Sequence, residues 1–283
     1  MCIYKYIDNI YIFLIHKLMS LSKKKNSLFN FHFFRIYIYH PFLFFFNFLR
    51  YPKSSLNLLN KVLNDNIFSI YNLEIKCPKK IDNYFFANLN SKFNSFILEK
   101  YEDSEKKLID KYLDKNDTVL ELGGCIGVIS NIINRKLVDK SSHLVLEIDN
   151  LKYNYLLENK ELNKAGYKLI NGVLSDKKNL YYEKSTNFLG GKLIEQKNDS
   201  PIKSYSLKYL ERQFGLIFNT LIMDIEGGEV ELIKEIRLNS FNKLIFEIHF
   251  DRSSNKYISI KKELTKNNFK LTDSDGKVEY WQR

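Results

Sequence analysis

From about Tyr101 onward, short apolar runs alternate with segments whose apolar residues recur at helical spacing. The short runs predict strands over residues 118–122, 143–148, 167–174, 219–224 and 243–250. The helical spacing predicts helices that begin near residue 103 and cover residues 128–137, 150–163, 207–213, 229–236 and 256–267. Residues 269–281 predict a terminal hairpin that turns at Asp275 and Gly276. This alternation predicts an α/β fold, with a mainly parallel sheet, helices on both faces and an antiparallel C-terminal edge hairpin.

The first hundred residues have a different pattern. Residues 1–66 are rich in aromatic and basic side chains, and we expect them to form a helical extension. Residues 67–100 carry short apolar alternations broken by Pro78, which predict a β lead-in segment. We therefore expect three parts: the extension 1–66, the lead-in 67–100 and the main domain 101–283.

Most of the positive charge lies in the extension. The chain has a net charge of +11, and residues 1–55 contribute +7 of it through eight Lys and Arg and one Asp. Positive charge beside apolar side chains favours contact with an anionic membrane surface over a nucleic-acid groove. A helical hairpin packed on the main domain is the open alternative. A transmembrane span is disfavoured, since the longest uncharged apolar run, residues 36–49, is too short and contains Pro41. Three scattered Cys residues indicate a reducing compartment, so we expect a cytoplasmic protein that can also associate with a membrane.

The first predicted strand leads into a glycine-rich turn. Glu121 is followed by Gly123, Gly124 and Gly127, and a helix begins directly afterwards. Glycines let the backbone turn sharply and approach a ligand closely, and the N-terminus of the helix suits an anionic group. Cys125 stands where the dinucleotide motif would have its second glycine, so the spacing differs from that motif. An ordinary tight turn is the alternative reading.

Acidic residues end the other strands. Glu147, about twenty residues after the glycines, can accept hydrogen bonds from both ribose hydroxyls of an adenosine. Backbone groups of Val173 and Leu174, at the end of the third strand, could line an adenine ring. A strand-end Glu exposed to solvent is the alternative for Glu147.

The fourth and fifth strands end in a denser set of charges. Asp224, Glu226 and Glu229 follow the fourth strand with two glycines and no Lys or Arg among them, an arrangement that costs stability unless a cation or a shared proton occupies it. Glu247 and His249 end the fifth strand at a spacing that points both side chains the same way. A His beside several acids is a candidate general base.

Together these segments resemble the FkbM family of S-adenosylmethionine-dependent methyltransferases. The resemblance rests on LELGGCIG (120–127), LEID (146–149), NGVLSD (171–176), MDIEGGE (223–229) and FEIH (246–249), in this order and spacing. It implies a class I Rossmann-like methyltransferase fold and an O-methyltransferase that acts on sugars or other hydroxyl acceptors. It also implies a set of cofactor-binding residues: Glu121, Gly123, Gly124 and Gly127 at the methionine end, Glu147 and Ile148 at the ribose, and Val173 and Leu174 at the adenine.

The resemblance further implies that Asp224 and Glu226 lie beside the transferred methyl group and the acceptor. Asp224 then also contacts the methionine end of the cofactor, and either His249 or Glu226 takes the acceptor's proton. Cys125 and Ile148 depart from the family pattern, in which Asn and Pro are common at these positions. A divalent ion held by Asp224 and Glu226 is the less favoured alternative, because no adjacent His or further carboxylate completes a hard-cation site, and we assign no metal ligands.

Three other functions remain open. A nicotinamide-dependent oxidoreductase would use a related sheet, but the glycine spacing counts against it. A non-catalytic nucleotide-binding module would be expected to have lost its strand-end carboxylates, which are present here. A nucleic-acid methyltransferase would need a basic catalytic half, and residues 56–283 carry only +4. We therefore expect a small-molecule, glycan or lipid-linked acceptor and no nucleic-acid partner. The sequence does not indicate the oligomeric state.

Overall fold

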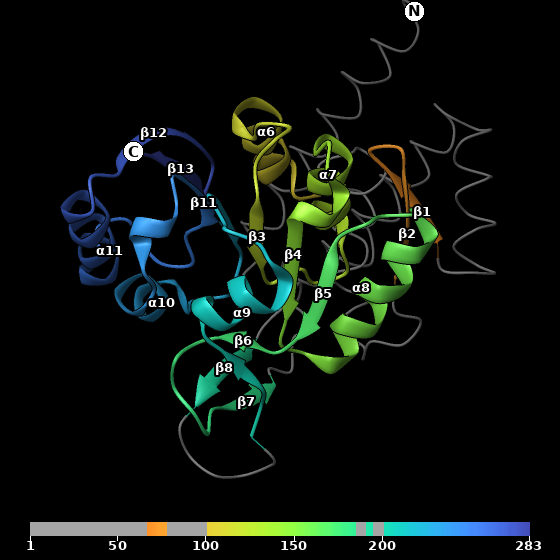
Figure 1. The fold of residues 1–283 in the computed structure, drawn as a ribbon. Helices are drawn as coiled ribbons and strands as arrows, with labels where there is room; N and C mark the ends of the chain where they lie inside the picture. The colour runs from red at the N-terminus through yellow and green to blue at the C-terminus, as the bar shows by residue number, and fades with distance from the viewer. Residues whose placement is uncertain (1–66, 78–100, 185–190, 195–200) are drawn as a thin grey trace, which may run out of the picture.

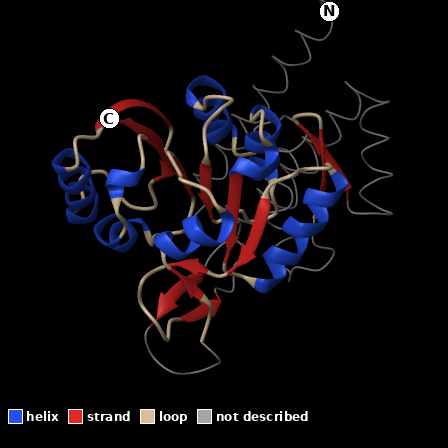
Figure 2. Ribbon diagram, in the orientation of Figure 1, coloured by secondary structure: helices blue, strands red, loops and turns tan. Residues whose placement is uncertain are grey.

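The computed structural model describes residues 67–77, 101–184, 191–194 and 201–283. The predictions made for residues 1–66 and 78–100 lie outside these ranges. Seven strands form the central sheet (Figures 1 and 2). Their order is β12 (Lys270–Asp275), β13 (Val278–Gln282), β11 (Lys243–Glu247), β10 (Thr220–Met223), β3 (Val119–Leu122), β4 (His143–Glu147) and β5 (Lys168–Asn171).

Strand direction confirms the predicted sheet. β10, β11, β3, β4 and β5 run parallel to one another, and β13 runs antiparallel to both β11 and β12. The apolar strands that predict a buried parallel sheet are in fact buried: every residue of β3, β4 and β10 is buried. This strand order, with β13 inserted between β11 and β12, is a Rossmann-like arrangement of the class I methyltransferase type.

Helices cover both faces of the sheet. On one face, α9 (Leu207–Phe214), α10 (Glu229–Glu235) and α11 (Asn255–Lys266) pack on apolar strand residues that include Leu120, Leu221 and Leu244. On the other face, α6 (Asp103–Tyr112) and α7 (Val128–Lys136) pack on a second set that includes Val119 and Ile222. Leu156 of α8 (Asn150–Leu162) packs against Val145 on the same side. The apolar faces seen in the sequence are thus the faces that bury the sheet.

Smaller elements surround this core. β1 (Ile67–Ile70) and β2 (Leu73–Lys76) form a hairpin, and Asn159 of α8 and Asn163, directly after α8, hydrogen-bond to the backbone of β2. The prediction of one continuous strand over 167–174 is wrong, because the strand is interrupted at Gly172. After it, β6 (Val173–Leu174) pairs with β9 (Ser204–Tyr205) instead of continuing the main sheet.

The remaining elements are a hairpin and two short helices. β7 (Tyr181–Lys184) pairs with β8 (Gly191–Ile194), and the 3-10 helices are η2 (Lys140–Ser142) and η3 (Leu238–Ser240). In the part of the chain that the structure describes, no helix is both long and apolar enough to cross a membrane.

The chain order places a switch point between β3 and β10. From β3 the chain proceeds to β4 and β5 on one side, then crosses to β10 and β11 on the other. Open parallel sheets bind ligands at the carboxyl ends of the strands that flank such a point. Glu147, which ends β4, and Asp224, which follows β10, are both singled out by the sequence and lie next to this crevice.

Candidate functional site

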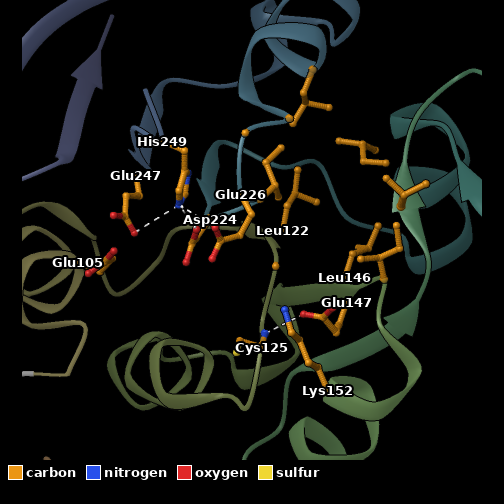
Figure 3. Close-up of a pocket in the computed structure, with 18 of the residues that line it drawn as sticks. Glu105, Leu122, Cys125, Leu146, Glu147, Lys152, Asp224, Glu226, Glu247 and His249 are labelled. Atoms are coloured by element: carbon orange, nitrogen blue, oxygen red, sulfur yellow. Dashed lines mark hydrogen bonds and ion pairs between the residues drawn. The ribbon is translucent and has the colours of Figure 1, made fainter. Parts of the chain in front are cut away.

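A cavity of about 1330 Å³ opens at the carboxyl ends of β3, β4, β10 and β11 (Figure 3). Its lining includes Gly123 after β3, Glu147 at the end of β4, Asp224 and Glu226 after β10, and His249 after β11. Pockets for a single drug-sized ligand are about 300–1,000 Å³. The cavity is therefore large enough for a cofactor together with a second molecule.

The glycine turn after β3 depends on Gly123. Its φ is +86°, and a Cβ added here would lie 1.9 Å from the backbone oxygen of Asp224. A residue without Cβ thus lets the ends of β3 and β10 come together at the cavity. Gly124 and Gly127 do not line the cavity; a Cβ on either would overlap Leu156 of α8, at 2.7 Å in both cases. They shape the turn but do not line the cavity. The resemblance implied direct contact with the cofactor, and the structure supports only this indirect role.

Glu147, for which the sequence predicts contact with a ribose, lies at one end of the cavity. Its side chain is buried but lines the cavity, and its carboxylate accepts hydrogen bonds from the backbone N–H groups of Cys125 and Asp149, both at 2.8 Å (Figure 3). Burial raises the pKa of Glu147, while the charge of Lys152 and the two backbone donors lower it. Each oxygen keeps a further lone pair for a ligand.

The neighbouring side chains are mostly apolar. Ile148, Val173 and Leu174, which the sequence predicts to contact the ribose and adenine, line this end of the cavity. Lys152 and Tyr182 also line it, and neither could be predicted from the sequence, because Lys152 lies within a helix and Tyr182 in a polar stretch. An apolar wall beside a carboxylate suits a base and its attached ribose.

Glu121 does not reach the cavity, and the expectation that it contacts the cofactor is corrected. Its side chain lies on the face of the sheet covered by α7, because alternate strand residues point to opposite faces. There it is buried, accepts a hydrogen bond from Ser130 Oγ at 2.8 Å and contacts His143 Nε2 at 2.8 Å. Its partner His143 is fully buried. The pair stabilises the interior between β3, β4 and α7.

The opposite end of the cavity gathers carboxylates around His249 (Figure 3). Nε2 of His249 lies 3.3 Å from Asp224 Oδ1, 3.6 Å from Glu226 Oε2 and 3.8 Å from Glu247 Oε2. Asp224, Glu247 and His249 each offer an atom suited to a metal ion, within 4.8 Å of one another. The sequence-based argument that no His or further carboxylate joins Asp224 is therefore wrong, since the ends of two adjacent strands meet here.

Glu229 is a functional residue that the sequence did not assign. It begins α10, is fully buried, and its Oε1 lies 2.8 Å from Nδ1 of His249 and accepts the backbone N–H of Gly227 at 3.1 Å. This contact turns Nε2 of the imidazole toward the cavity. The sequence signal for it is its place in the cluster of three acids after the fourth strand, which assigns no individual role to Glu229.

The electrostatics of this end follow from the crowding of acids. Burial, with the charge of Glu247, raises the pKa of Asp224 to about 7. Burial also raises the pKa of Glu105, which the first turn of α6 places beside Glu247, to about 7. Burial lowers the pKa of His249, but its hydrogen bond to Glu229 and the nearby carboxylates outweigh this and raise it to about 9. At this end of the cavity the carboxylates outnumber the cationic groups, so the site would stabilise a cationic ligand.

Comparisons with known proteins return structural likenesses alone. No family model matches the chain, and no curated protein matches it in sequence. One structural likeness is to a ribosomal protein L11 methylase from Lactobacillus delbrueckii subsp. bulgaricus, at 16% identity and a TM-score of 0.41 over 64% of this chain and 77% of that one. A methyltransferase from Pyrococcus furiosus matches at 13% identity and 0.42, over 81% and 95%. An Aeropyrum pernix fibrillarin with S-adenosyl-L-methionine bound matches at 12% and 0.38, over 62% and 73%.

Proposed function

We propose that the protein is an S-adenosylmethionine-dependent O-methyltransferase of the FkbM type, which methylates a hydroxyl of a sugar, glycan or lipid-linked acceptor. One observation carries the proposal. A single cavity at the switch point of the sheet joins Glu147, beside an apolar wall, to the carboxylates of Asp224 and Glu226. A nucleoside suits the first end and a sulfonium cation the second.

The residues at the cavity fit the cofactor by their chemistry. Glu147 would accept the ribose hydroxyls, and Ile148, Val173 and Leu174 would enclose the adenine. The turn at Gly123 brings the ends of β3 and β10 together, so Asp224 would hold the methionine end of the cofactor and its carboxylate would offset the sulfonium charge. Glu121 and the glycines at 124 and 127 support this arrangement from outside the cavity.

The chemistry asked of the protein is alignment and proton removal. When bound, the cofactor supplies an electrophilic methyl group: its S–CH₃ bond breaks while the acceptor oxygen forms an O–CH₃ bond. Glu226 and His249 both face the point where Asp224 lies, and one of them takes the hydroxyl proton as the new bond forms. Holding the acceptor in line with the methyl group can contribute several kcal/mol of the lowering of the barrier.

Calorimetry with S-adenosylmethionine and, separately, with a nicotinamide dinucleotide tests the assignment. We expect the first to bind and the second not to. Glu147→Gln should weaken S-adenosylmethionine about 10- to 100-fold, because hydrogen bonds to charged groups contribute about 1.5–3 kcal/mol. Glu161→Gln, on the exposed side of α8, is the matched control and should bind normally. Dinucleotide binding alone would instead support an oxidoreductase.

Turnover is tested with labelled cofactor and a panel of glycans and lipid-linked hydroxyl compounds. His249→Ala should lower turnover while cofactor affinity stays nearly intact. Unchanged turnover would remove His249 from the reaction. Labelling of RNA in the same panel would contradict the expected absence of a nucleic-acid partner.

We further propose that the protein is cytoplasmic and that residues 1–55 bring it to an anionic membrane surface. The support is their net charge of +7 beside many aromatic side chains. A membrane contact would place the cavity near lipid-linked acceptors. It is independent of the methyl-transfer proposal.

A further inference from the structure

The cluster around His249 has the spacing of ligands that share one metal ion. Atoms bound at about 2.1 Å to an octahedral ion lie about 3 Å from their neighbours and about 4.2 Å from the opposite ligand. His249 Nε2 lies 3.3 Å from Asp224 Oδ1 and 3.8 Å from Glu247 Oε2. Two separate strand ends thus hold three ligand atoms at distances that one ion can bridge.

The surroundings of the imidazole match those of a metal ligand. A ligating His almost always gives its other ring nitrogen to a carboxylate or carbonyl, which fixes the ring. Glu229 holds Nδ1 of His249 in this way, at 2.8 Å, and is itself fully buried. The ring nitrogen left over, Nε2, faces the carboxylates and the cavity.

An oxygen atom in the cluster lacks a hydrogen bond. Oδ1 of Asp224 is buried and has no hydrogen-bond partner among the described residues, and Nε2 of His249 lies 3.3 Å from it. Buried carboxylate oxygens are rarely left without a donor or a cation. Glu226 and Glu105 also line the cavity beside the cluster and add further negative charge. A cation between Asp224 Oδ1 and His249 Nε2 would satisfy both the unbonded oxygen and the oriented imidazole.

We propose that Asp224, Glu247 and His249 bind a divalent cation, with Glu229 as the positioning residue for His249. One imidazole and two carboxylates suit a first-row ion such as Mn²⁺, and the open side toward the cavity leaves positions for oxygen ligands. If the proposed function is right, one of those positions receives the acceptor hydroxyl, whose proton the cation makes easier to remove. Nε2 is then a ligand, and Glu226 is the group that takes the proton.

Binding of Mn²⁺ alone tests the site, with no cofactor or acceptor present. The full-length chain is stripped with a chelator, dialysed and titrated with Mn²⁺, and free Mn²⁺ is followed by its electron paramagnetic resonance signal. We expect saturable binding of one ion. Asp224→Asn and His249→Ala should each weaken it at least tenfold, and Glu229→Gln should weaken it about 10- to 100-fold by releasing the imidazole.

Glu235→Gln is the matched control, because Glu235 lines the same cavity but pairs with Lys177 at 2.9 Å. It should bind Mn²⁺ like the wild-type chain. Absence of saturable 1:1 binding to the wild-type chain up to 1 mM Mn²⁺ overturns the proposal whether or not the variants fold, where about 1 mM corresponds to only about −4 kcal/mol of binding free energy. Equal binding by wild type, Asp224→Asn and His249→Ala also overturns it, and a protonated His249 then explains the cluster.

The same samples allow the test of the cation site to be distinguished from the test of the proposed methyltransferase function. Cofactor binding is measured by calorimetry in the presence of a chelator. A chain that binds S-adenosylmethionine but no Mn²⁺ leaves methyl transfer standing and removes the cation. A chain that binds Mn²⁺ but no S-adenosylmethionine does the reverse.

Discussion

Replacing Gly123 by Ala should disrupt the contact between the ends of β3 and β10. A non-glycine residue in the left-handed region costs roughly 1–2 kcal/mol. The new Cβ would also lie 1.9 Å from the backbone oxygen of Asp224, about 1.5 Å closer than ordinary contact at 3.4 Å. Because that atom belongs to the backbone, no side-chain rotation relieves the overlap, and repacking of this kind costs about 1–3 kcal/mol more. The expected total is about 2–5 kcal/mol.

Gly215→Ala separates the two contributions. Gly215 ends α9 with φ +65°, and nothing lies within 4 Å of an added Cβ. This variant should therefore pay the backbone cost alone, about 1–2 kcal/mol. It lies outside the cavity lining and should bind S-adenosylmethionine normally.

Urea unfolding of the two variants and the wild type, followed by circular dichroism, measures the difference. We expect Gly123→Ala to lose about 1–3 kcal/mol more than Gly215→Ala and to bind the cofactor much more weakly. Equal losses of stability in the two variants, with equal cofactor affinity, would refute the reasoning that the approach of Asp224 demands a glycine here.

Two further predictions concern features outside the cluster. Glu121→Ala should destabilise the chain by about 1–3 kcal/mol, because it leaves the buried His143 Nε2 without its hydrogen-bond partner, yet S-adenosylmethionine should bind the folded fraction nearly as before; loss of affinity at unchanged stability would return Glu121 to the cofactor site. The full chain should co-sediment with anionic vesicles, less so at high salt, and a chain lacking residues 1–55 should not; equal sedimentation of both would end the membrane proposal.

Much of the fold could be predicted from local pattern. The buried runs at 118–122, 143–148, 219–224 and 243–250 became parallel strands, because a strand covered on both faces must be apolar throughout. Alternation of strands and helices then leaves few possible topologies. The break at Gly172 was missed, since its cause is distant in sequence: a Cβ there would lie 2.6 Å from the backbone oxygen of Lys203.

In the site too, residues placed by local sequence could be predicted, and residues placed by packing between distant segments could not. The positions of Glu147, Asp224 and Glu226 at the cavity could be predicted because each lies at or just after the carboxyl end of a parallel strand, and these ends converge. Glu105 could not, because it lies in α6, upstream of β3, and only packing brings it beside Glu247. Glu121 was expected at the cavity because it lies one residue before the end of a strand. Neighbouring strand residues point to opposite faces of the sheet, and the side chain of Glu121 points away from the cavity.

The backbone conformation at Cys125 bears on one departure from the family pattern, the Cys that stands where Asn is common. Cys125 and Glu226 both have left-handed backbones, with φ of 49° and 53°, and both line the cavity. Asn adopts this region several-fold more readily than most residues, so an Asn at position 125 would suit this backbone better than Cys does. The backbone N–H of Cys125 still donates to Glu147 at 2.8 Å, and the side chain is not needed for that contact. The departure therefore leaves the proposed ribose site whole, and the strain lies at the two turns that hold the cavity open.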